Sequence, residues 1–305
     1  MTKHPRPAWL IGAIAAASVV TVVAVAGCAR LGGELVQRPR TRQAAVSVAG
    51  DMVQLTSASL PRLNFAAQAD TPVEDLLPEG DRPLPMNGLC PPDMASIDDR
   101  FCIDKYEASL VEILPNGQER AWPYYEPVEG HVVRAVSEKG VYPQGYISGN
   151  QAAEACKRSG KRLCKPREWK TACKGPEETK FPYGNEHHRG TCNDHGRSGM
   201  GKLFGAEIAQ GKGFVWNNMN HPDLNQLEGT LAETGSHEGC TNGYGVYDMV
   251  GNLHEWVDDP AGVFQGGYYL DVQQNGDGCG YRTDAHATWY HDYSTGFRCC
   301  ADVAQ

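Results

Sequence analysis

Two acidic side chains flank a glycine turn in the segment between Asp248 and Glu255. The backbone carbonyls of Gly251 and Leu253 can turn inward together with the two carboxylates. Such an all-oxygen shell is the kind of site that calcium prefers. The alternative is a capped turn that holds no ion. The segment is therefore a candidate calcium site built from Asp248, Gly251, Leu253 and Glu255.

Cys28 ends a stretch with the features of a bacterial lipoprotein signal. A short basic start precedes an uncharged apolar segment, Trp9–Gly27. Such a segment is typical of a secretory signal, and it is excluded from the folded domain. The small residues before Cys28 resemble a lipobox, in which the thiol takes a diacylglyceryl group. We predict a signal peptide over residues 1–27, lipidation of Cys28 and a lipid-anchored location in the cell envelope. The alternative is an uncleaved anchor, because about 19 apolar residues just span a bilayer.

The remaining cysteines indicate a disulfide framework. The chain has eleven cysteines, and all except Cys28 lie after residue 89. An even number of cysteines in an exported chain favours disulfide bonds. No pair has Cys-x-x-Cys spacing, and no pair has histidines at zinc-finger spacing, so a zinc site is disfavoured.

Composition divides the chain into a tether and one domain. Residues 28–87, which follow the signal peptide, are poor in aromatic residues, and we expect an extended tether there. Residues 88–305 hold most of the glycines and aromatic residues and form the folded domain. The net charge of −9 argues against a nucleic-acid partner, which needs clustered Lys and Arg.

Few regular elements are expected to position these residues. Phe101–Glu107 has the composition of an early strand. Ser148 or Asn150 can cap a helix over Gln151–Ser159, which ends at Gly160. A second helix begins at Pro166 and ends before Gly175. After residue 176 the sequence shows little periodicity, so we expect long ordered loops held by disulfides, ions or both.

Five blocks of the domain resemble, in order, the formylglycine-generating enzymes, also called sulfatase-modifying factors. Each block alone is a modest match, but five in order with sensible spacing are specific. The resemblance covers residues 89–303. The blocks are Phe101–Ala108 (FCIDKYEA), Ala152–Cys173 (AAEACKRSGKRLCKPREWKTAC), Phe181–Gly184 (FPYG), Asn242–Trp256 (NGYGVYDMVGNLHEW), and the closing pair Gly266-Gly267 and Gly296-Phe297-Arg298.

The resemblance implies an α+β fold related to C-type lectins, with little regular secondary structure. It also implies calcium as a structural cofactor. One ion falls on the four positions between Asp248 and Glu255, with the carbonyls from Gly251 and Leu253. A second site maps to Asn193, Asp194, Asn225 and Leu227.

The resemblance further implies two disulfides that tie the predicted helices to the C-terminal segment. Elimination and proximity suggest the other three pairs. The expected disulfides are Cys156–Cys299 and Cys173–Cys279 from the resemblance, then Cys90–Cys102, Cys192–Cys240 and, by what remains, Cys164–Cys300.

The chain departs from the family where its oxidase chemistry occurs. That chemistry uses a copper-binding pair of cysteines after the two glycines, but residues 267–278 contain no cysteine. The soft ligands that cuprous copper needs are therefore absent. Tyr268 replaces the serine after the glycines, and His254 replaces the aromatic residue before the Glu-Trp pair. We expect neither copper binding nor conversion of cysteine to formylglycine.

Other polar residues in these blocks are weaker candidates for chemistry. His254, Tyr268 and Asp271 are the candidate catalytic residues, with plain packing as the alternative for His254. We expect His286 and His291 to lie in surface loops. We expect Arg298 to stabilise the fold through buried hydrogen bonds.

Three functions remain open from the sequence. The first is an oxidoreductase of another kind that acts on an exported peptide or protein, its metal unspecified. The second is a calcium-stabilised, lectin-like module that binds a peptide, protein or glycan. Tyr268, Tyr269, Trp289 and Tyr290 would then be contact residues. The third is a structural envelope protein. In each case we expect a monomer that contacts the membrane through its lipid.

Overall fold

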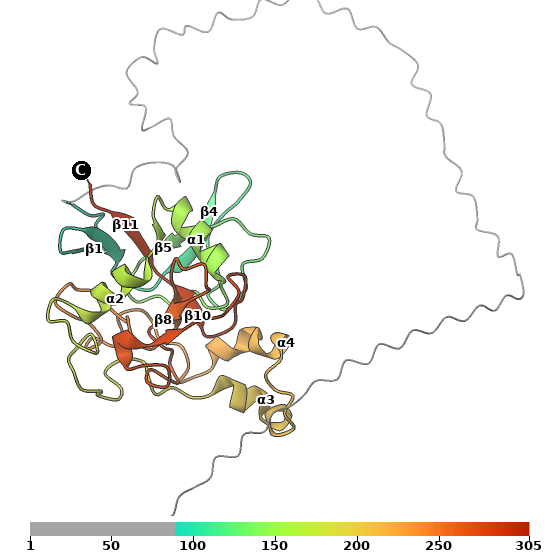
Figure 1. The fold of residues 1–305 in the computed structure, drawn as a ribbon. Coiled ribbons are helices and arrows are strands. Elements are labelled where there is room, and N and C mark those ends of the chain that lie inside the picture. Colours follow the sequence, from blue (N-terminus) through green and yellow to red (C-terminus); the bar gives the residue numbers. More distant parts are fainter. Residues whose placement is uncertain (1–88, 305) are drawn as a thin grey trace, which may run out of the picture. The chain divides into compact units, whose positions relative to one another are not determined.

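The computed structural model describes residues 89–304 (Figure 1). The predicted signal peptide, Cys28 and the whole predicted tether lie outside the described residues. The described part of the chain is an α+β domain of short elements joined by long loops. Its helices are α1 (Gly149–Arg158), α2 (Pro166–Lys174), α3 (Gly199–Ala209) and α4 (Trp216–Met219), with 3-10 helices at Pro222–Gln226 and Gly278–Gly280.

The strands form three small sheets. Their orders are β1-β2-β11-β6, β10-β7-β8-β9 and β4-β3-β5. The last strand pairs with β2, so the two ends of the domain lie in one sheet. The strands are β1 (Met94–Ile97), β2 (Phe101–Asp104), β3 (Ser109–Ile113), β4 (Glu119–Ala121), β5 (Val133–Val136), β6 (Arg162–Leu163), β7 (His254–Trp256), β8 (Phe264–Gln265), β9 (Arg282–Thr283), β10 (Thr295–Phe297) and β11 (Cys299–Asp302).

The first expected helix forms where its capping residues predict. The backbone N–H of Gln151 donates to the Ser148 hydroxyl, and the N–H of Ser148 donates to the Gln151 side chain. This reciprocal capping box satisfies two backbone donors that the helix leaves free. The helix α1 spans Gly149–Arg158, and Gly160 follows it with a φ of 66°. A glycine adopts this left-handed backbone without strain.

The second expected helix also forms, and it carries a buried aromatic residue to the centre of the domain. Pro166 starts α2, and Gly175 follows its end with a φ of 70°. A Cβ at Gly175 would lie 2.9 Å from the Cβ of Asn242, so the close approach of that loop requires glycine. Trp169, Ala172 and Cys173 form the buried face of α2.

The expectation of loops alone after residue 176 was wrong for the helices α3 and α4 and for the short strands β7 to β11, and α3 is the longest of these elements. Helix α3 covers Gly199–Ala209, capped by the hydroxyl of Ser198, which accepts the N–H of Gly201. Three glycines and a kink at Phe204 obscure the apolar period in the sequence. Packing against the 3-10 helix Pro222–Gln226 stabilises the helical conformation of α3, which its local helix propensity does not favour.

Five disulfides hold the loops on this framework. They join the ten cysteines in the same pairs that the sequence analysis lists. The adjacent cysteines of β11 bond to different partners, Cys299 to Cys156 in α1 and Cys300 to Cys164 after β6. Strand β11 is thus bonded covalently both to α1 and to the residue that follows β6.

Candidate functional site

The centre of the domain holds a buried ion pair between Glu255 and Arg298. The guanidinium Nε and one terminal nitrogen each lie 2.7 Å from a carboxylate oxygen of Glu255. The indole nitrogen of Trp169 donates to the same carboxylate at 2.6 Å. Arg298 also donates to the carbonyls of Asp104 and Tyr247. Arg298 therefore stabilises the fold as expected, because it joins β7, β2 and the loop before β7.

A second buried carboxylate, Glu107, was not identified from the sequence. One of its oxygens accepts the backbone N–H of Leu253, and the other accepts the side-chain amide of Asn252 at 2.5 Å. Asn252 in turn accepts a hydrogen bond from Asn193. The available signal was the position of Glu107 in the block that ends at Ala108, where the sequence predicted only a strand. We call Glu107, Asp248, Glu255 and Arg298 the buried polar cluster.

The buried polar cluster has more acidic than basic side chains. Glu107, Asp248 and Glu255 face one guanidinium, and all four side chains are buried. Burial raises the pKa of Glu107 well above its usual value, and the neighbouring carboxylates raise it further. Burial likewise raises the pKa of Asp248 to about 6. Excess negative charge in the core is costly unless protons or a cation offset it.

The first expected calcium set lies within this cluster. The turn is tight, because Asp248, Gly251 and Asn252 all have positive φ angles, and a Cβ at Gly251 would lie 2.3 Å from the carbonyl oxygen of Asn193. One oxygen of Asp248 accepts the N–H of Gly235. Both oxygens of Glu255 already face Arg298. An ion here would have to share Glu255 with that guanidinium.

The residues of the second expected calcium set are engaged in hydrogen bonds of the surrounding loops. The side-chain amide of Asn193 donates to the carbonyl of Thr230, and the amide of Asn225 donates to the carbonyl of Tyr293. The carbonyl of Leu227 accepts the hydroxyl of Thr230. The carboxylate of Asp194 faces His187, with 2.6 Å between Oδ2 and Nε2. Asn193 and Leu227 thus share Thr230 as a partner, the buried Oδ1 atom of Asn225 has no hydrogen-bond partner among the described residues, and calcium at this set stays a prediction.

Within residues 89–304, no three side chains of His, Cys, Asp or Glu are grouped so that they could hold a metal ion. A calcium site built on two carboxylates and backbone carbonyls falls outside that description. In the same range, no helix is long and apolar enough to cross a membrane.

The three candidate catalytic residues lie near one another, around a buried imidazole. The rings of Phe264 and Tyr268 stack on His254, with centroids 4.7 and 4.8 Å away. Burial lowers the pKa of His254 to about 3, and its Nδ1 atom is buried without a hydrogen-bond partner. Asp271 accepts the hydroxyl of Tyr281, whose ring lies 5.5 Å from His254. His254 is therefore a neutral, aromatic-packed group.

The expectation of a surface loop was wrong for His291. Its Nδ1 lies 2.7 Å from the side-chain oxygen of Asn220, and its Nε2 lies 2.5 Å from a carboxylate oxygen of Glu129. The side chain is buried because the loop that carries it folds against α4. His286 is half-buried, with its ring 4.8 Å from those of Phe264 and Tyr290.

Large apolar side chains gather at the surface beside His291. The exposed fractions are 64% for Phe214, 48% for Val215, 44% for Trp216 and 64% for Trp289. The two indole rings are 6.2 Å apart and inclined at 51°. We call these four residues the aromatic surface. Exposed apolar groups that cluster in this way mark interaction sites.

Only part of the aromatic surface was predicted from the sequence. Trp289 was an expected contact residue and is exposed, whereas Tyr268 and Tyr290 are half-buried. The expectation was wrong for Tyr269, which is fully buried because it packs with Tyr146 and Tyr293. Phe214 and Trp216 were missed. Three consecutive apolar residues after the glycines of residues 211–213 were the available signal.

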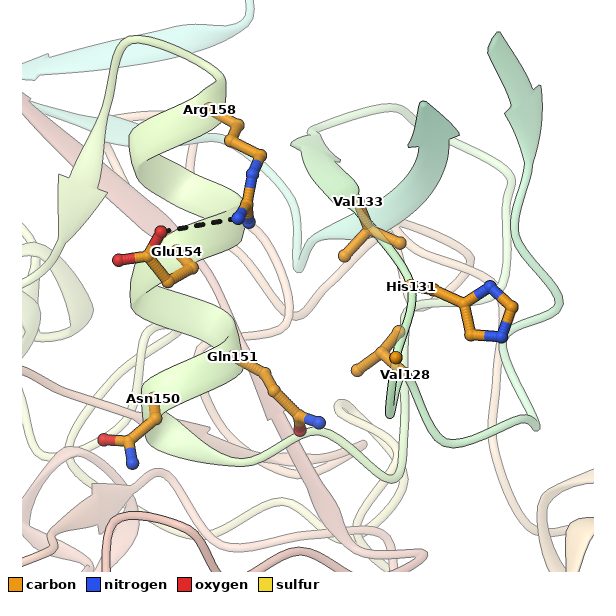
Figure 2. Close-up of a pocket in the computed structure, with 8 residues that line it drawn as sticks. Val128, His131, Val133, Asn150, Gln151, Glu154 and Arg158 are labelled. Carbon is orange, nitrogen blue, oxygen red and sulfur yellow. Dashed lines mark ion pairs between the residues drawn. The ribbon is translucent and has the colours of Figure 1, made fainter. Parts of the chain in front are cut away.

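A separate pocket of about 260 Å³ lies between α1 and the loop before β5 (Figure 2). Val128 and Val133 line its apolar side. Glu154 and Arg158 of α1 form an ion pair of 3.5 Å on the other side. No candidate residue from the sequence analysis lines this pocket.

Comparison with known proteins identifies the class. Residues 34–303 match the sulfatase-modifying factor enzyme 1-like domain, and the chain belongs to that family. It is 30% identical over 148 residues to the formylglycine-generating enzyme of Mus musculus, which covers 46% of this chain and 35% of that protein. The enzyme of Bos taurus matches at the same identity over 34% of its length. The chain thus spans about a third of the curated relatives it matches.

Solved structures with a similar fold are more distant in sequence. PvdO from Pseudomonas aeruginosa is 17% identical, covering 66% of this chain and 80% of that chain, with a TM-score of 0.39. Treponema denticola variable protein 1 is 16% identical, covering 71% and 93%, with a TM-score of 0.41. The described domain has an α+β fold with little regular secondary structure, as the sequence implied.

Proposed function

We propose that this protein is an envelope lipoprotein whose domain binds an exported peptide or protein through the aromatic surface. The observation that carries the proposal is the clustering of Phe214, Val215, Trp216 and Trp289 at the surface. Tryptophan side chains contribute much of the binding energy in protein interfaces. The buried hydrogen bonds of His291 hold the platform on which Trp216 packs, with 4.8 Å between the two rings.

The proposal excludes the oxidase reaction of the copper-dependent relatives. All ten cysteines of the described residues are in disulfides, so that region offers no free thiol. Thiolate is the form that binds cuprous copper and attacks substrates. The domain would then retain the scaffold of the family for recognition while lacking that chemistry.

Lipidation of Cys28 is the second part of the proposal. Five disulfides indicate a compartment outside the reducing cytoplasm, which supports export. Mass spectrometry of the N-terminal peptide of the mature protein tests it. A diacylglyceryl group on Cys28 is expected, and a mature chain that still begins at Met1 would contradict it.

Calcium is the third part, at Asp248, Glu255 and the carbonyls of Gly251 and Leu253. The excess of carboxylates in the buried polar cluster supports a bound cation. A divalent ion would offset the charge that Arg298 leaves unbalanced. The ion would have a structural role, because these groups are buried beneath the surface loops.

A phage-displayed library of random peptides tests the binding function. Peptides selected on the wild-type protein should lose binding to the double variant Trp216→Ala/Trp289→Ala. Val132→Ala is the matched control, because Val132 is 47% exposed and lies outside the aromatic surface. Failure to select any peptide, or equal binding to the double variant, would sink the proposal.

An oxidoreductase of another kind is the second candidate, and the unpartnered Nδ1 of buried His254 favours it. Unsatisfied buried polar atoms are rare and often occur at functional sites. A peptide selected on the wild-type protein can be incubated with it in air and analysed by mass spectrometry. A mass change that His254→Phe abolishes would support this candidate.

A further inference from the structure

Helix α2 has a cationic outer face. Arg167, Lys170 and Lys174 recur at helical spacing, so their side chains lie on one side of the helix. Arg167 and Lys170 are exposed, and Lys174 is half-buried. The opposite side carries Trp169 and Cys173 into the core. Figure 1 places α2 apart from α3 and α4, so this face is distinct from the aromatic surface.

Neighbouring cations divide into those used by the fold and those left free. Lys161 pairs with Asp93 and Asp104, and Arg162 pairs with Glu168 and Asp302. Four cations of α2 and its N-cap have no ion pair within residues 89–304, and they form what we call the cationic face: Lys165, Arg167, Lys170 and Lys174.

The charge of this segment opposes that of the chain. Residues 157–174 contain eight Lys or Arg and one Glu, whereas the whole chain has a net charge of −9. A molecule with such an uneven charge distribution orients in an electric field or at a charged surface. The negative net charge of the whole chain concealed this cluster of cationic residues.

We propose that the cationic face binds an anionic phospholipid surface and thereby orients the domain on the membrane. These four residues are spread from the N-cap of α2 to its last residue. The pocket beside the end of α2 is lined by Arg100 and Lys174 but also by Asp98 and Glu178, so it is unsuited to one small anion. A broad array of cations matches a planar array of phosphate headgroups.

The inference rests on the proposed envelope location. A lipid on Cys28 would hold the domain close to the bilayer, where weak electrostatic contacts suffice because the local concentration of headgroups is high. The acidic remainder of the domain would face away from the membrane. The aromatic surface, on a separate part of the domain, would remain free for its ligand.

Vesicle binding by the mature chain, residues 28–305 with Cys28→Ser, tests the inference without a lipid anchor and without the apolar signal segment. We expect binding to vesicles of equal parts phosphatidylglycerol and phosphatidylcholine, and none to phosphatidylcholine alone. The triple variant Arg167→Gln/Lys170→Gln/Lys174→Gln should weaken binding by at least about tenfold. Raising the salt concentration should also weaken it, because salt screens exposed charges.

The matched control removes three exposed cations elsewhere, with Lys202→Gln, Lys212→Gln and Arg189→Gln. Equal loss in both triple variants, or wild-type binding to neutral vesicles, would overturn the inference. Peptide selection on the α2 triple variant separates the two proposals, since peptide binding should survive there. Absence of a lipid on Cys28 would defeat the proposed anchor but would leave the vesicle result unchanged.

Discussion

The buried polar cluster and the aromatic surface both reverse the usual distribution of side chains, in which polar groups contact solvent and large apolar groups are buried. In the core, Glu107, Asp248, Glu255 and Arg298 are nearly inaccessible to solvent, and hydrogen bonds join them to strands far apart in sequence. At the surface, the aromatic surface exposes four large apolar side chains. Polar groups are normally solvated and tryptophans are normally covered, so each arrangement needs a reason.

The difference between the two regions separates stability from binding. A domain with so little regular structure has few backbone ladders, and its buried polar contacts and disulfides fix the loops. The aromatic surface contributes little to stability, since its side chains remain in contact with water. Changes in the core should therefore alter unfolding, and changes in the aromatic surface should alter ligand binding.

The largest effect on stability is expected from the disulfide Cys192–Cys240, whose loop is not largely closed by another disulfide. The double variant Cys192→Ala/Cys240→Ala opens a loop with a sequence separation of 48 residues, whereas loss of Cys156–Cys299 would leave the adjacent Cys164–Cys300 bond holding nearly the same loop. Loss of about 4 kcal/mol is expected, because a long closed loop restricts the unfolded chain most. Chemical denaturation measures it. Cys90→Ala/Cys102→Ala, with a separation of 12, is the control and should cost about 3 kcal/mol. The reverse order would contradict the entropic account.

Breaking the buried ion pair should cost nearly as much. Arg298→Met leaves Glu255 buried without its cation, and a loss of about 3–5 kcal/mol is expected. The control is Arg100→Met, which removes an exposed ion pair with Asp98 and should leave stability nearly unchanged, because water and salt screen exposed charges. Similar melting temperatures for the two variants would show that the core cluster is not what stabilises the domain.

Calcium should raise the melting temperature of the wild-type protein. An ion present at 100 times its dissociation constant adds about 2.7 kcal/mol if it binds only the folded state. Thermal unfolding in excess chelator and in millimolar calcium measures the difference. Asp248→Asn should abolish the calcium effect, whereas Asp223→Asn, which changes an exposed carboxylate, should retain it. No shift in the wild-type protein would argue against the site.

Acid should destabilise the domain partly through His254. The folded-state pKa of His254 is about 3, below the usual 6.5, so the unfolded chain binds a proton that the folded chain excludes. Stability should therefore fall by about 1.4 kcal/mol for each pH unit as the pH drops from about 6.5 toward about 3. His254→Phe should flatten this limb, and His188→Phe, at an exposed site, should not. Identical pH profiles would show that His254 titrates normally.

The smallest effect on stability is expected at the aromatic surface. Trp216→Ala/Trp289→Ala should change the free energy of unfolding by no more than about 0.5 kcal/mol for each substitution, because surface changes rarely cost more. The same variant should lose the selected peptides. A large loss of stability would mean that the tryptophans are part of the core, and the comparison between the two regions would fail.

Local signals in the sequence determined helices α1 and α2 and the class of fold. Ser148 with Gln151, and Pro166 with Gly175, mark helix ends because capping depends on residues a few positions apart. The order of the five blocks established the family without any structure. The missing cysteines between residues 267 and 278 likewise needed only the sequence, since an absent thiol cannot be supplied by folding.

Only the tertiary structure decided which groups meet. Glu107 approaches Leu253 across 146 residues, and Trp216 lies beside Trp289 because two separate loops fold together. The partners of Asn193 and Asn225 likewise depend on the path of the loop between them. The cationic face of α2 could be identified only from the structure, because the structure determines that Lys161 and Arg162 are neutralised by ion pairs within the domain. Burial and pairing depend on contacts between distant segments, and local sequence does not encode those contacts.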